Sequence, residues 1–477
     1  MPKTTLKGLL PQELKKGLTP AEEILLEKAQ QGESADFRNG DKETDKPENA
    51  GNWGDDRRIR ADLLYWLCVD REASELVHAK GIRIDGAKVE GPLDFDGATL
   101  PHRLCLTHCA IPEKIILRDA QTHTIILSGS HTGPITADRL ITQGAVFLRD
   151  GFHAKGAVRL LGANIGGPLS CTGATFENPR GTALNADRLT TQGGVSLRGT
   201  QTKGEVRLSG ADLKGNLACD GATFENPGGQ ALSAERLSVK GGLFWRSMKE
   251  RPIGAIDLVH AKVGRLVDDA ESWPLADNVW LDGFEYEAFG VNSPRTAKER
   301  LHWLALQPQK PFHPQPYEQL AKVFKQMGRE ADTRQVLIAK QDALRKYGEL
   351  SRMSKVWKRF LGWTIAHGYK PWRVLWWIMV PMIVIGSGVF SWAYDLQIID
   401  EVKKSAPPFS PFIYSLEVFV PLVDLHQESY YLPNAKGTCS AWDCGAWFRA
   451  YFWFHIVLGW VSSTLLVAAL TGLVRKE

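Results

Sequence analysis

The stretch IRIDGAKVEGPLDFDGATL, residues 82–100, contains one short unit twice. The unit reads apolar, any residue, apolar, any residue, Gly, Ala, any residue, apolar, and it starts at Ile82 and again at Leu93. Four alternating residues predict a short strand with two side chains facing inward. The glycine then permits a sharp corner, and the alanine is small enough to sit inside it. A unit of this size cannot bury its own apolar face, so we expect copies of it to stack.

Further copies of the unit follow along the chain. Those that start at positions 82, 93, 104 and 115 are 11 residues apart, and others start at 158, 169 and 217. Stacked units of this kind predict a mainly β protein whose central part is a right-handed parallel β-solenoid. If two 11-residue units make one coil, residues 81–267 form about eight coils and a rod of roughly 40 Å.

The heptapeptide GATFENP occurs at residues 173–179 and again at 221–227. It is either a duplicated active site or a coil corner with its loop. The second interpretation is favoured, because the heptapeptide is in register with the repeat and its proline ends strand pairing. Cys171 and Cys219, two residues before each copy, then point inward as small apolar side chains with at least one coil between them.

One segment of the solenoid contains four residues of the types that bind zinc, His102, Cys105, His108 and Cys109. The repeat places Cys105 outward and Cys109 inward, so we do not expect the four to share an ion. Dinucleotide, Walker, zinc-protease and serine-hydrolase motifs are missing from the sequence. We therefore expect neither a catalytic residue nor a bound cofactor. The outward positions mix both charge signs, which argues against nucleic-acid binding.

Two segments near the C-terminus are long and apolar enough to cross a bilayer. Residues 374–394 contain no charge, and in residues 450–474 His455 is the single group that titrates near neutral pH. Each is long enough to span about 30 Å of hydrocarbon. Basic residues flank the pair on its outer sides, and the loop 395–449 is net acidic. This asymmetry predicts a multi-pass protein of the bacterial inner membrane with both termini cytoplasmic.

Basic residues concentrate before the first span. Residues 294–373 contain 17 Lys and Arg against 6 Asp and Glu, although the whole chain has a net charge of only +4. Such a region either contacts anionic lipid headgroups or is simply a solvated surface. The residues assigned to a basic membrane surface are Arg345, Lys346, Arg352, Lys355, Lys358, Arg359, Lys370 and Arg373.

These patterns divide the chain into four parts. They are a helical cap at 1–80 with a disordered stretch at 32–52, the β-solenoid at 81–290, a basic helical linker at 291–372 with a helical hairpin at 316–348, and a membrane module at 373–477.

Between the two spans, residues 409–425 are apolar but too short to cross a bilayer, which predicts a re-entrant or interfacial helix. A helix, a half-length helix and a second helix in this order resemble the two-span pore module of tetrameric cation channels. The resemblance implies an acidic ring that attracts cations, but the glycine-containing filter of potassium channels is missing. The alternative is an outward interfacial hairpin clamped by a disulfide between Cys439 and Cys444. The residues expected in a pore or re-entrant site are Tyr414, Glu417, Asp424, His426, Glu428 and Gly459.

Four longer motifs occur along the chain: WGDDRRIRADLLYWL at 53–67, PYEQLAKVF at 316–324, GYKPWR at 368–373 and YSLEVFVPLVDL at 414–425. Together they resemble a group of bacterial membrane proteins that are often labelled membrane-associated oxidoreductases or pentapeptide-repeat-like proteins. The resemblance covers nearly the whole chain. It implies a cytoplasmic solenoid joined to a membrane anchor, and a redox activity for which the sequence shows no motif.

Three functions follow from these predictions. The first is a noncatalytic scaffold or sensor that presents the solenoid surface to a partner protein at the inner membrane. The second is a pore formed by a homo-oligomer and gated by the solenoid, and the third is an oxidoreductase. We also expect contact with membrane lipids and no contact with nucleic acid.

Overall fold

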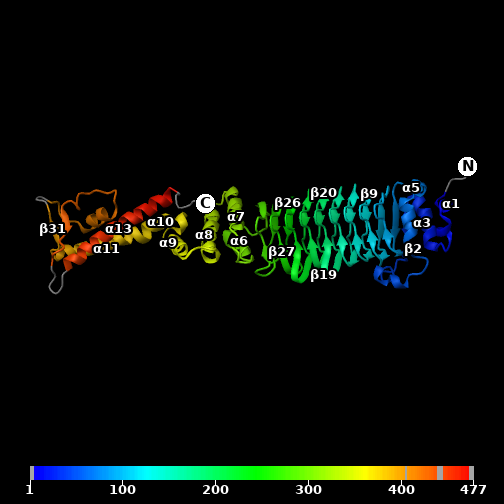
Figure 1. Cartoon of the computed structure of the whole chain (residues 1–477), viewed down its shortest axis with the longest axis horizontal. Coiled ribbons are helices and arrows are strands. Elements are labelled where there is room, and N and C mark those ends of the chain that lie inside the picture. Colours follow the sequence, from blue (N-terminus) through cyan, green and yellow to red (C-terminus); the bar gives the residue numbers. More distant parts are fainter. Residues whose placement is uncertain (1–4, 403–405, 438–443, 472–477) are drawn as a thin grey trace. The chain divides into compact units, whose positions relative to one another are not determined.

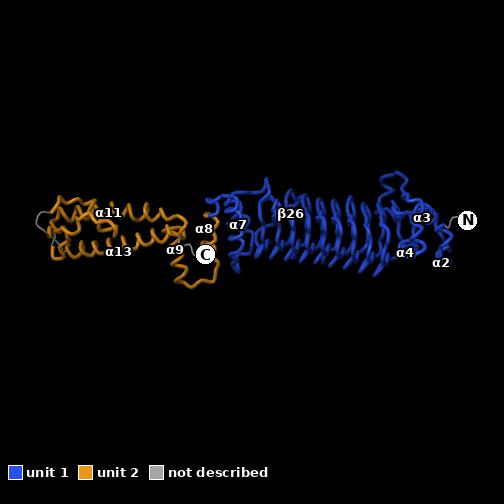
Figure 2. Tube along the Cα trace, turned by 90° about the horizontal axis from the view of Figure 1, so that it is seen from above, with its two compact units in different colours: residues 1–333 blue, residues 334–477 orange. Residues whose placement is uncertain are grey.

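A computed structural model describes residues 5–402, 406–437 and 444–471 of the chain. The chain forms two compact units, residues 1–333 and residues 334–477 (Figure 2). The first unit contains the solenoid with its caps, and the second contains the apolar helices. The division falls inside the segment that the sequence assigns to a linker.

Unit 1 is built around a parallel β-solenoid (Figure 1). Ile82 pairs with Leu104, and Leu104 pairs with Ile125, so one coil takes about 22 residues. From Ile82 to Phe289 the chain makes about nine turns. At about 4.8 Å per coil, the stack is roughly 40 Å long. The repeat therefore predicted the fold and the size of a coil correctly.

Each coil has four short sides. In the coil that begins at Leu104 they are β6 (Leu104–Thr107), β7 (Ala110–Ile111), β8 (Ile115–Ile116) and β9 (Gln121–Thr122). Two 11-residue units make one coil, as expected, and each unit supplies two strands with a corner between them.

A left-handed backbone conformation makes the corners within the units. Gly86 and Gly97 have φ angles of +72° and +65°, as the motif predicts. One coil later the same two corners are formed by His108 and Asp119, with φ angles of +48° and +56°. Aspartate and histidine tolerate this conformation better than most residues. The conformation is therefore repeated even where the glycine is not.

The strands form two long sheets in which all pairings are parallel. The first sheet consists of β1 (Ala35–Asp36), β3 (Ile82–Asp85), β6, β9, β10 (Ile125–Ile126), β13 (Ile141–Thr142), β14 (Val146–Phe147), β17 (Asn164–Ile165), β18 (Leu169–Ser170), β20 (Thr190–Thr191), β21 (Val195–Ser196), β23 (Asp212–Leu213), β24 (Leu217–Ala218), β26 (Ser238–Trp245), β28 (Lys262–Asp268) and β30 (Glu285–Phe289). The second consists of β2 (Arg58–Arg60), β4 (Lys88–Glu90), β5 (Leu93–Asp94), β7, β8, β11 (His131–Thr132), β12 (Ile135–Thr136), β15 (His153–Lys155), β16 (Val158–Arg159), β19 (Thr175–Asn185), β22 (Gln201–Arg207), β25 (Thr223–Ser233), β27 (Ile253–Asp257) and β29 (Val279–Trp280).

The repeated heptapeptide forms a corner, as predicted. The residues after the corner were predicted to be a loop, but they belong to a long strand, β19 or β25, that protrudes where the register shifts. Its first glycine, Gly173 or Gly221, has a positive φ, and its phenylalanine is fully buried. In the first copy the Asn178 side chain donates to the Thr182 carbonyl at 3.0 Å and closes the protrusion. In the second copy Asn226 does the same for Gln230 at 2.7 Å.

Helices cover the first coil of the solenoid. They are α1 (Leu6–Leu9), α2 (Gln12–Lys15), α3 (Pro20–Gln31), a 3₁₀ helix (Pro47–Asn52), α4 (Ala61–Val69) and α5 (Arg71–Leu76). Strands β1 and β2 pair with β3 and β4, so both sheets begin within this cap. The helix α3 starts at a capping box in which Thr19 and Glu22 satisfy each other's backbone N–H groups.

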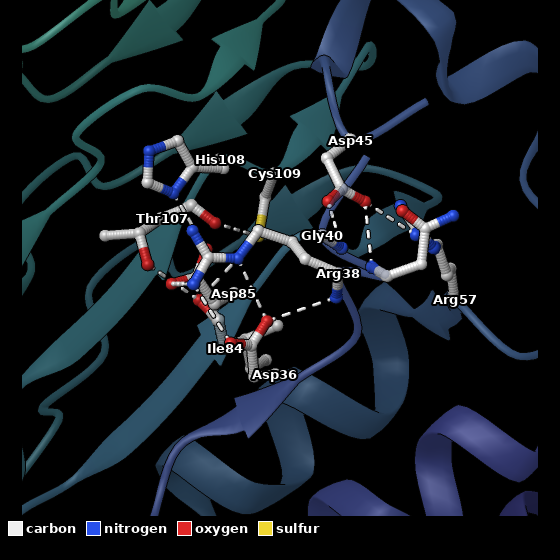
Figure 3. A network of polar contacts seen from close by, with 11 residues as sticks. Asp36, Arg38, Gly40, Asp45, Arg57, Ile84, Asp85, Thr107, His108 and Cys109 are labelled. Atoms are coloured by element: carbon white, nitrogen blue, oxygen red, sulfur yellow. Dashed lines mark hydrogen bonds and ion pairs between the residues drawn. The ribbon is translucent and has the colours of Figure 1, made fainter. Parts of the chain in front are cut away.

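Residues 32–52, which the sequence predicts to be disordered, are ordered in the structure. Asp45 holds them together, since its carboxylate accepts the backbone N–H groups of Asn39 at 3.0 Å and Gly40 at 2.9 Å. The same carboxylate pairs with Arg57 at 2.7 Å (Figure 3). The polar composition that suggested disorder instead provides side-chain acceptors for the backbone.

The other end of the solenoid is covered by α6 (Ala297–Leu304) and α7 (Gln315–Gln326). The Gln319 side chain donates to the Tyr286 carbonyl at 2.6 Å and fixes α7 to the last coil. Arg300 on α6 forms two hydrogen bonds of 2.7 Å with the Asp268 carboxylate at the end of β28. Both side chains are buried, so this is an ion pair shielded from water.

Unit 2 is mainly helical, and α8 (Glu330–Tyr347) begins just before the division. Its other helices are α9 (Arg352–Ile365), a 3₁₀ turn (Ala366–Gly368), α10 (Trp372–Val374), a π-helical turn (Leu375–Met379), α11 (Val380–Asp395), α12 (Pro411–Phe419) and α13 (Cys444–Leu470). A two-stranded antiparallel hairpin, β31 (Ile399–Glu401) and β32 (Tyr431–Pro433), lies between α11 and α13 in the sequence.

Two helical segments of unit 2 are long and apolar enough to cross a membrane. They are Trp372–Asp395, which runs without a break through α10 and α11, and Cys444–Leu470. Both overlap the spans predicted at 374–394 and 450–474. The helix α12 occupies part of the segment 409–425, and at 9 residues it is too short to span a bilayer.

Candidate functional site

A polar contact lies among the apolar helices of unit 2. The hydroxyl of Ser415 on α12 donates to the Ile383 carbonyl on α11 at 2.8 Å. The same hydroxyl is 3.1 Å from Nε2 of His455 on α13, and Nε2 is also 3.3 Å from the Ser415 carbonyl. Ser415 and His455 are both completely buried. The contact therefore ties the three helices together.

The geometry fixes the tautomer of His455. A serine hydroxyl has one proton, and Ser415 donates it in the hydrogen bond to the Ile383 carbonyl. The hydrogen bond to His455 must then be donated by the ring, which puts the proton on Nε2. The other ring nitrogen, Nδ1, is buried and has no hydrogen-bond partner within the described residues. Nδ1 of His455 is thus a buried hydrogen-bond acceptor on an apolar helix, with no donor among the described residues.

Two glycines make room for α12 beside this contact. A Cβ atom at Gly386 on α11 would lie 2.9 Å from Nε2 of His455. A Cβ atom at Gly459 on α13 would lie 2.7 Å from the carbonyl carbon of Phe419, the last residue of α12. Such close approaches of helix backbones require residues without side chains. The sequence assigns Gly459 to a pore, and the structure places it against α12.

Tyr414 and Glu417, also predicted pore residues, anchor the segment that follows α12. The Tyr414 hydroxyl donates to the Tyr431 carbonyl at 3.0 Å. The Glu417 carboxylate is buried and accepts the backbone N–H groups of Gln427 at 2.8 Å and Glu428 at 3.2 Å. These contacts satisfy backbone donors after the helix ends, so both side chains have a structural role in this conformation.

The remaining predicted pore residues lie on an exposed turn. Asp424 and His426 are each 75% exposed, and His426 Nδ1 is 2.8 Å from Asp424 Oδ1. Glu428 follows them, and burial together with the nearby Glu417 and Asp424 carboxylates raises its pKa above the usual range. Of the six predicted residues, Tyr414, Glu417 and Gly459 are therefore buried, Asp424 and His426 are exposed, and Glu428 is partly buried. The described parts of the chain contain no group of three or more His, Cys, Asp or Glu placed to hold a metal ion.

Cys444, at the start of α13, is buried and disulfide-bonded. Cys439, its predicted partner, lies outside the described residues. The pairing of Cys439 with Cys444 stays a prediction.

The basic residues before the first span lie on or next to an amphipathic helix. Arg352, Lys355, Lys358 and Arg359 belong to α9, Arg345 and Lys346 to α8, and Lys370 and Arg373 flank the start of the span. An apolar stripe on α9, which was not among the predicted features, accompanies these cations. Its members are at least 37% exposed and recur at helical spacing: Met353, Val356, Trp357, Phe360 and Trp363.

Cys171 and Cys219 in the solenoid are buried apolar side chains, as predicted. Cys171 and Cys219 are fully buried, and Leu197 on the coil between them separates the two thiols. Burial raises the pKa of Cys171 to about 12. Cys109 is fully buried whereas Cys105 is partly exposed, which agrees with the opposite orientations expected from the repeat.

Charged side chains on the solenoid surface pair between neighbouring coils. Arg159 contacts Asp138 at 2.7 Å, and Arg207 contacts Asp187 at 2.8 Å. Similar pairs between coils join Arg118 to Asp96, Arg139 to Asp119 and Arg246 to Asp220. The ladder balances positive and negative charge between neighbouring coils.

No family model, curated protein or solved structure matches the chain. The resemblance to membrane-associated oxidoreductases stays a prediction from the sequence motifs.

Proposed function

We propose that the chain is a membrane-anchored scaffold or sensor that holds its β-solenoid at the cytoplasmic surface of the bacterial inner membrane. The observation that carries this proposal is the uncovered apolar surface of unit 2. In the most apolar part of each long helix, only 28% and 22% of the residues are buried inside the protein. The core helix of a water-soluble protein would be mostly buried. Lipid is the covering that suits two such helices.

The side chains on these helices also support the proposal that lipid covers them. Trp377, Trp453 and Trp460 are 77%, 60% and 59% exposed. Indole rings are favoured at the boundary between lipid and water, where the first of these residues would lie. The helix α9 combines an apolar stripe with lysine and arginine, a pattern typical of helices that lie in the membrane surface. Its position before the first span favours a cytoplasmic location for the basic residues and for the solenoid.

The solenoid is better suited to binding a partner protein than to catalysis. Its thiols are buried, and many of its surface charges are engaged in pairs between coils. The protruding strands β19 and β25 repeat the same surface two coils apart, which gives a partner protein a periodic surface to contact. An oxidoreductase would be indicated instead by a flavin, haem or metal that copurifies with the chain.

A substitution on the lipid-facing surface tests the anchor. Val457 lies at the middle of α13 and is 61% exposed. An arginine there should disfavour insertion by about 2.5–3.5 kcal/mol. We expect the unchanged chain to stay with membranes after a sodium carbonate wash and Val457→Arg to be largely released or degraded. Val402→Arg is the control, since Val402 is an apolar residue of similar exposure, 55%, outside both spans.

Protease protection tests the orientation. The solenoid should be cut in inverted membrane vesicles and protected in intact spheroplasts. The proposal would be refuted by a chain that carbonate releases, by equal behaviour of Val457→Arg and Val402→Arg, or by a solenoid that is cut in intact spheroplasts.

A second function, passage of protons or cations, is favoured by His455. An ionisable side chain buried within a membrane span is a candidate for transport, and here its Nδ1 is unpartnered within the described residues. Such a pore would be built from several copies. It predicts a symmetric oligomer in detergent and a conductance in planar bilayers that changes on His455→Gln or Asp424→Asn. A monomer without conductance would exclude it and leave the scaffold proposal in place.

A further inference from the structure

Two cavities lie side by side at the start of the first span. The larger, of about 520 Å³, is lined by Arg334, Lys370, Trp372 and Arg373 among others. The smaller, of about 260 Å³, is lined by Trp363 and Ile378 among others. Arg373 and Trp377 line both, so the two cavities adjoin at these side chains. The larger one has the size of an ordinary ligand site.

The larger cavity is cationic. Among the described lining residues, Arg334, Lys370 and Arg373 contribute to its wall, and no Asp or Glu does. Within the described residues, the side chains of Lys370 and Arg373 form no ion pair or hydrogen bond. Cations left unpaired in an aromatic pocket favour an anionic group, and a guanidinium binds a phosphate through two parallel hydrogen bonds.

The smaller cavity is apolar. Trp363 and Trp377 are 72% and 77% exposed, and Ile378 of the span lines the same cavity. An exposed apolar groove suits a hydrocarbon chain better than a polar metabolite. The groove adjoins the cationic cavity at Arg373, so one molecule with an anionic head and an apolar tail would fill both.

We infer that these cavities form a binding site for one anionic phospholipid, with the phosphate held by Arg373, Lys370 and Arg334 and the upper acyl chain against Trp363, Trp377 and Ile378. The inference rests on the proposed membrane anchoring, because it places the start of the first span at the level of the headgroups. It goes beyond a general attraction of basic residues to the membrane surface, since it names a stoichiometric site with a defined lining. The bound lipid would also connect α9 to the start of the span.

Native mass spectrometry of the full chain in detergent tests the site, with phosphatidylglycerol and phosphatidylcholine as probes. We expect one phosphatidylglycerol to bind at least tenfold more tightly than phosphatidylcholine. Arg373→Gln should weaken phosphatidylglycerol binding by about tenfold or more, because a charged hydrogen-bond pair is lost. Arg373→Lys should recover only part of the affinity, and Trp377→Ala should weaken binding of both lipids. Lys436→Gln is the control, because Lys436 is an exposed cation of the same unit that lines neither cavity.

Inorganic phosphate distinguishes a lipid from a free anion. Millimolar phosphate should displace little phosphatidylglycerol if the acyl chain contributes to binding. The inference would be overturned by equal binding of the two lipids, by Arg373→Gln behaving like Lys436→Gln, or by phosphate competing fully with phosphatidylglycerol. The carbonate wash is a separate readout. A chain that stays in membranes without preferring phosphatidylglycerol would retain its anchor and lose this site.

Discussion

Removal of Arg300 should open the last coils of the solenoid. Its guanidinium forms two 2.7 Å hydrogen bonds with Asp268, donates from Nε to the Pro294 carbonyl at 2.9 Å, and stacks 3.9 Å from the centre of the Phe289 ring. The side chains of Arg300 and Asp268 are 0% and 1% exposed. In Arg300→Met, Asp268 keeps one hydrogen bond, from the Trp273 indole. The remaining carboxylate oxygen would be left buried and unpaired.

The magnitude follows from this burial. Loss of one partner of a buried ion pair costs about 3–5 kcal/mol, because the other charge stays desolvated. If the last coils open as a local unit, amide exchange in β28 and β30 should accelerate on the order of 10²- to 10³-fold. Hydrogen–deuterium exchange of the full chain, read by mass spectrometry for peptides that cover these strands, measures this directly. The double variant Arg300→Met with Asp268→Leu should restore much of the protection, because it removes both charges.

Arg236→Met is the matched control. Its side chain is 74% exposed and pairs only with the neighbouring Glu235, at 3.3 Å. The same substitution there should change stability by less than about 1 kcal/mol. Equal exchange in the two single variants, or no recovery in the double variant, would refute the reasoning that the shielded pair locks this end of the solenoid.

Three further predictions concern other parts of the chain. Gly459→Ala should lower the melting temperature in detergent because its Cβ would overlap the end of α12, whereas Gly388→Ala, with no atom within 4 Å of the new Cβ, should not; equal effects would argue against the close packing. Burial lowers the pKa of His131, so the unfolded state takes up the proton first and unit 1 should lose stability as the pH falls below about 6.5; His131→Gln should flatten that loss in urea titrations. Because the pKa of Cys171 is raised to about 12, iodoacetamide at pH 8 should modify Cys105 first and leave Cys171 unmodified until the solenoid unfolds; early labelling of Cys171 by mass spectrometry would contradict its burial.

Much of the solenoid was predictable because its contacts repeat with the sequence. The 11-residue unit gave the coil length, the inward positions of Cys171 and Cys219 and the meaning of the twin heptapeptide. Two features were not predicted. The first is the corner inside those units where His108 or Asp119 replaces the glycine that marks it elsewhere. The order of residues 32–52 depends on the Asp45 carboxylate, whose hydrogen-bond donors on Asn39, Gly40 and Arg57 are brought together by the folded chain.

The candidate site was predictable only in part. Composition located both spans, the short helix and the basic residues, since each is a local property of the sequence. The contact among Gly386, Ser415 and His455 joins positions far apart in the chain, and no spacing rule connects them. One signal was present, because His455 is the single group in the predicted span 450–474 that titrates near neutral pH. Glu417 was assigned to a pore, and its role as a hydrogen-bond acceptor for the backbone after α12 was not predicted.

The stacking of coils also makes the length of the solenoid adjustable in whole steps. Leu104, Ile125 and Val146 occupy the same place on successive coils. Deletion of residues 125–145 would bring Val146 onto Leu104 with every inward position preserved, and it would shorten the rod by about 4.8 Å. Duplication of the same segment would lengthen it by an equal amount. Duplication or loss of one coil could thus change the reach of the rod in regular increments while both of its ends stay as they are.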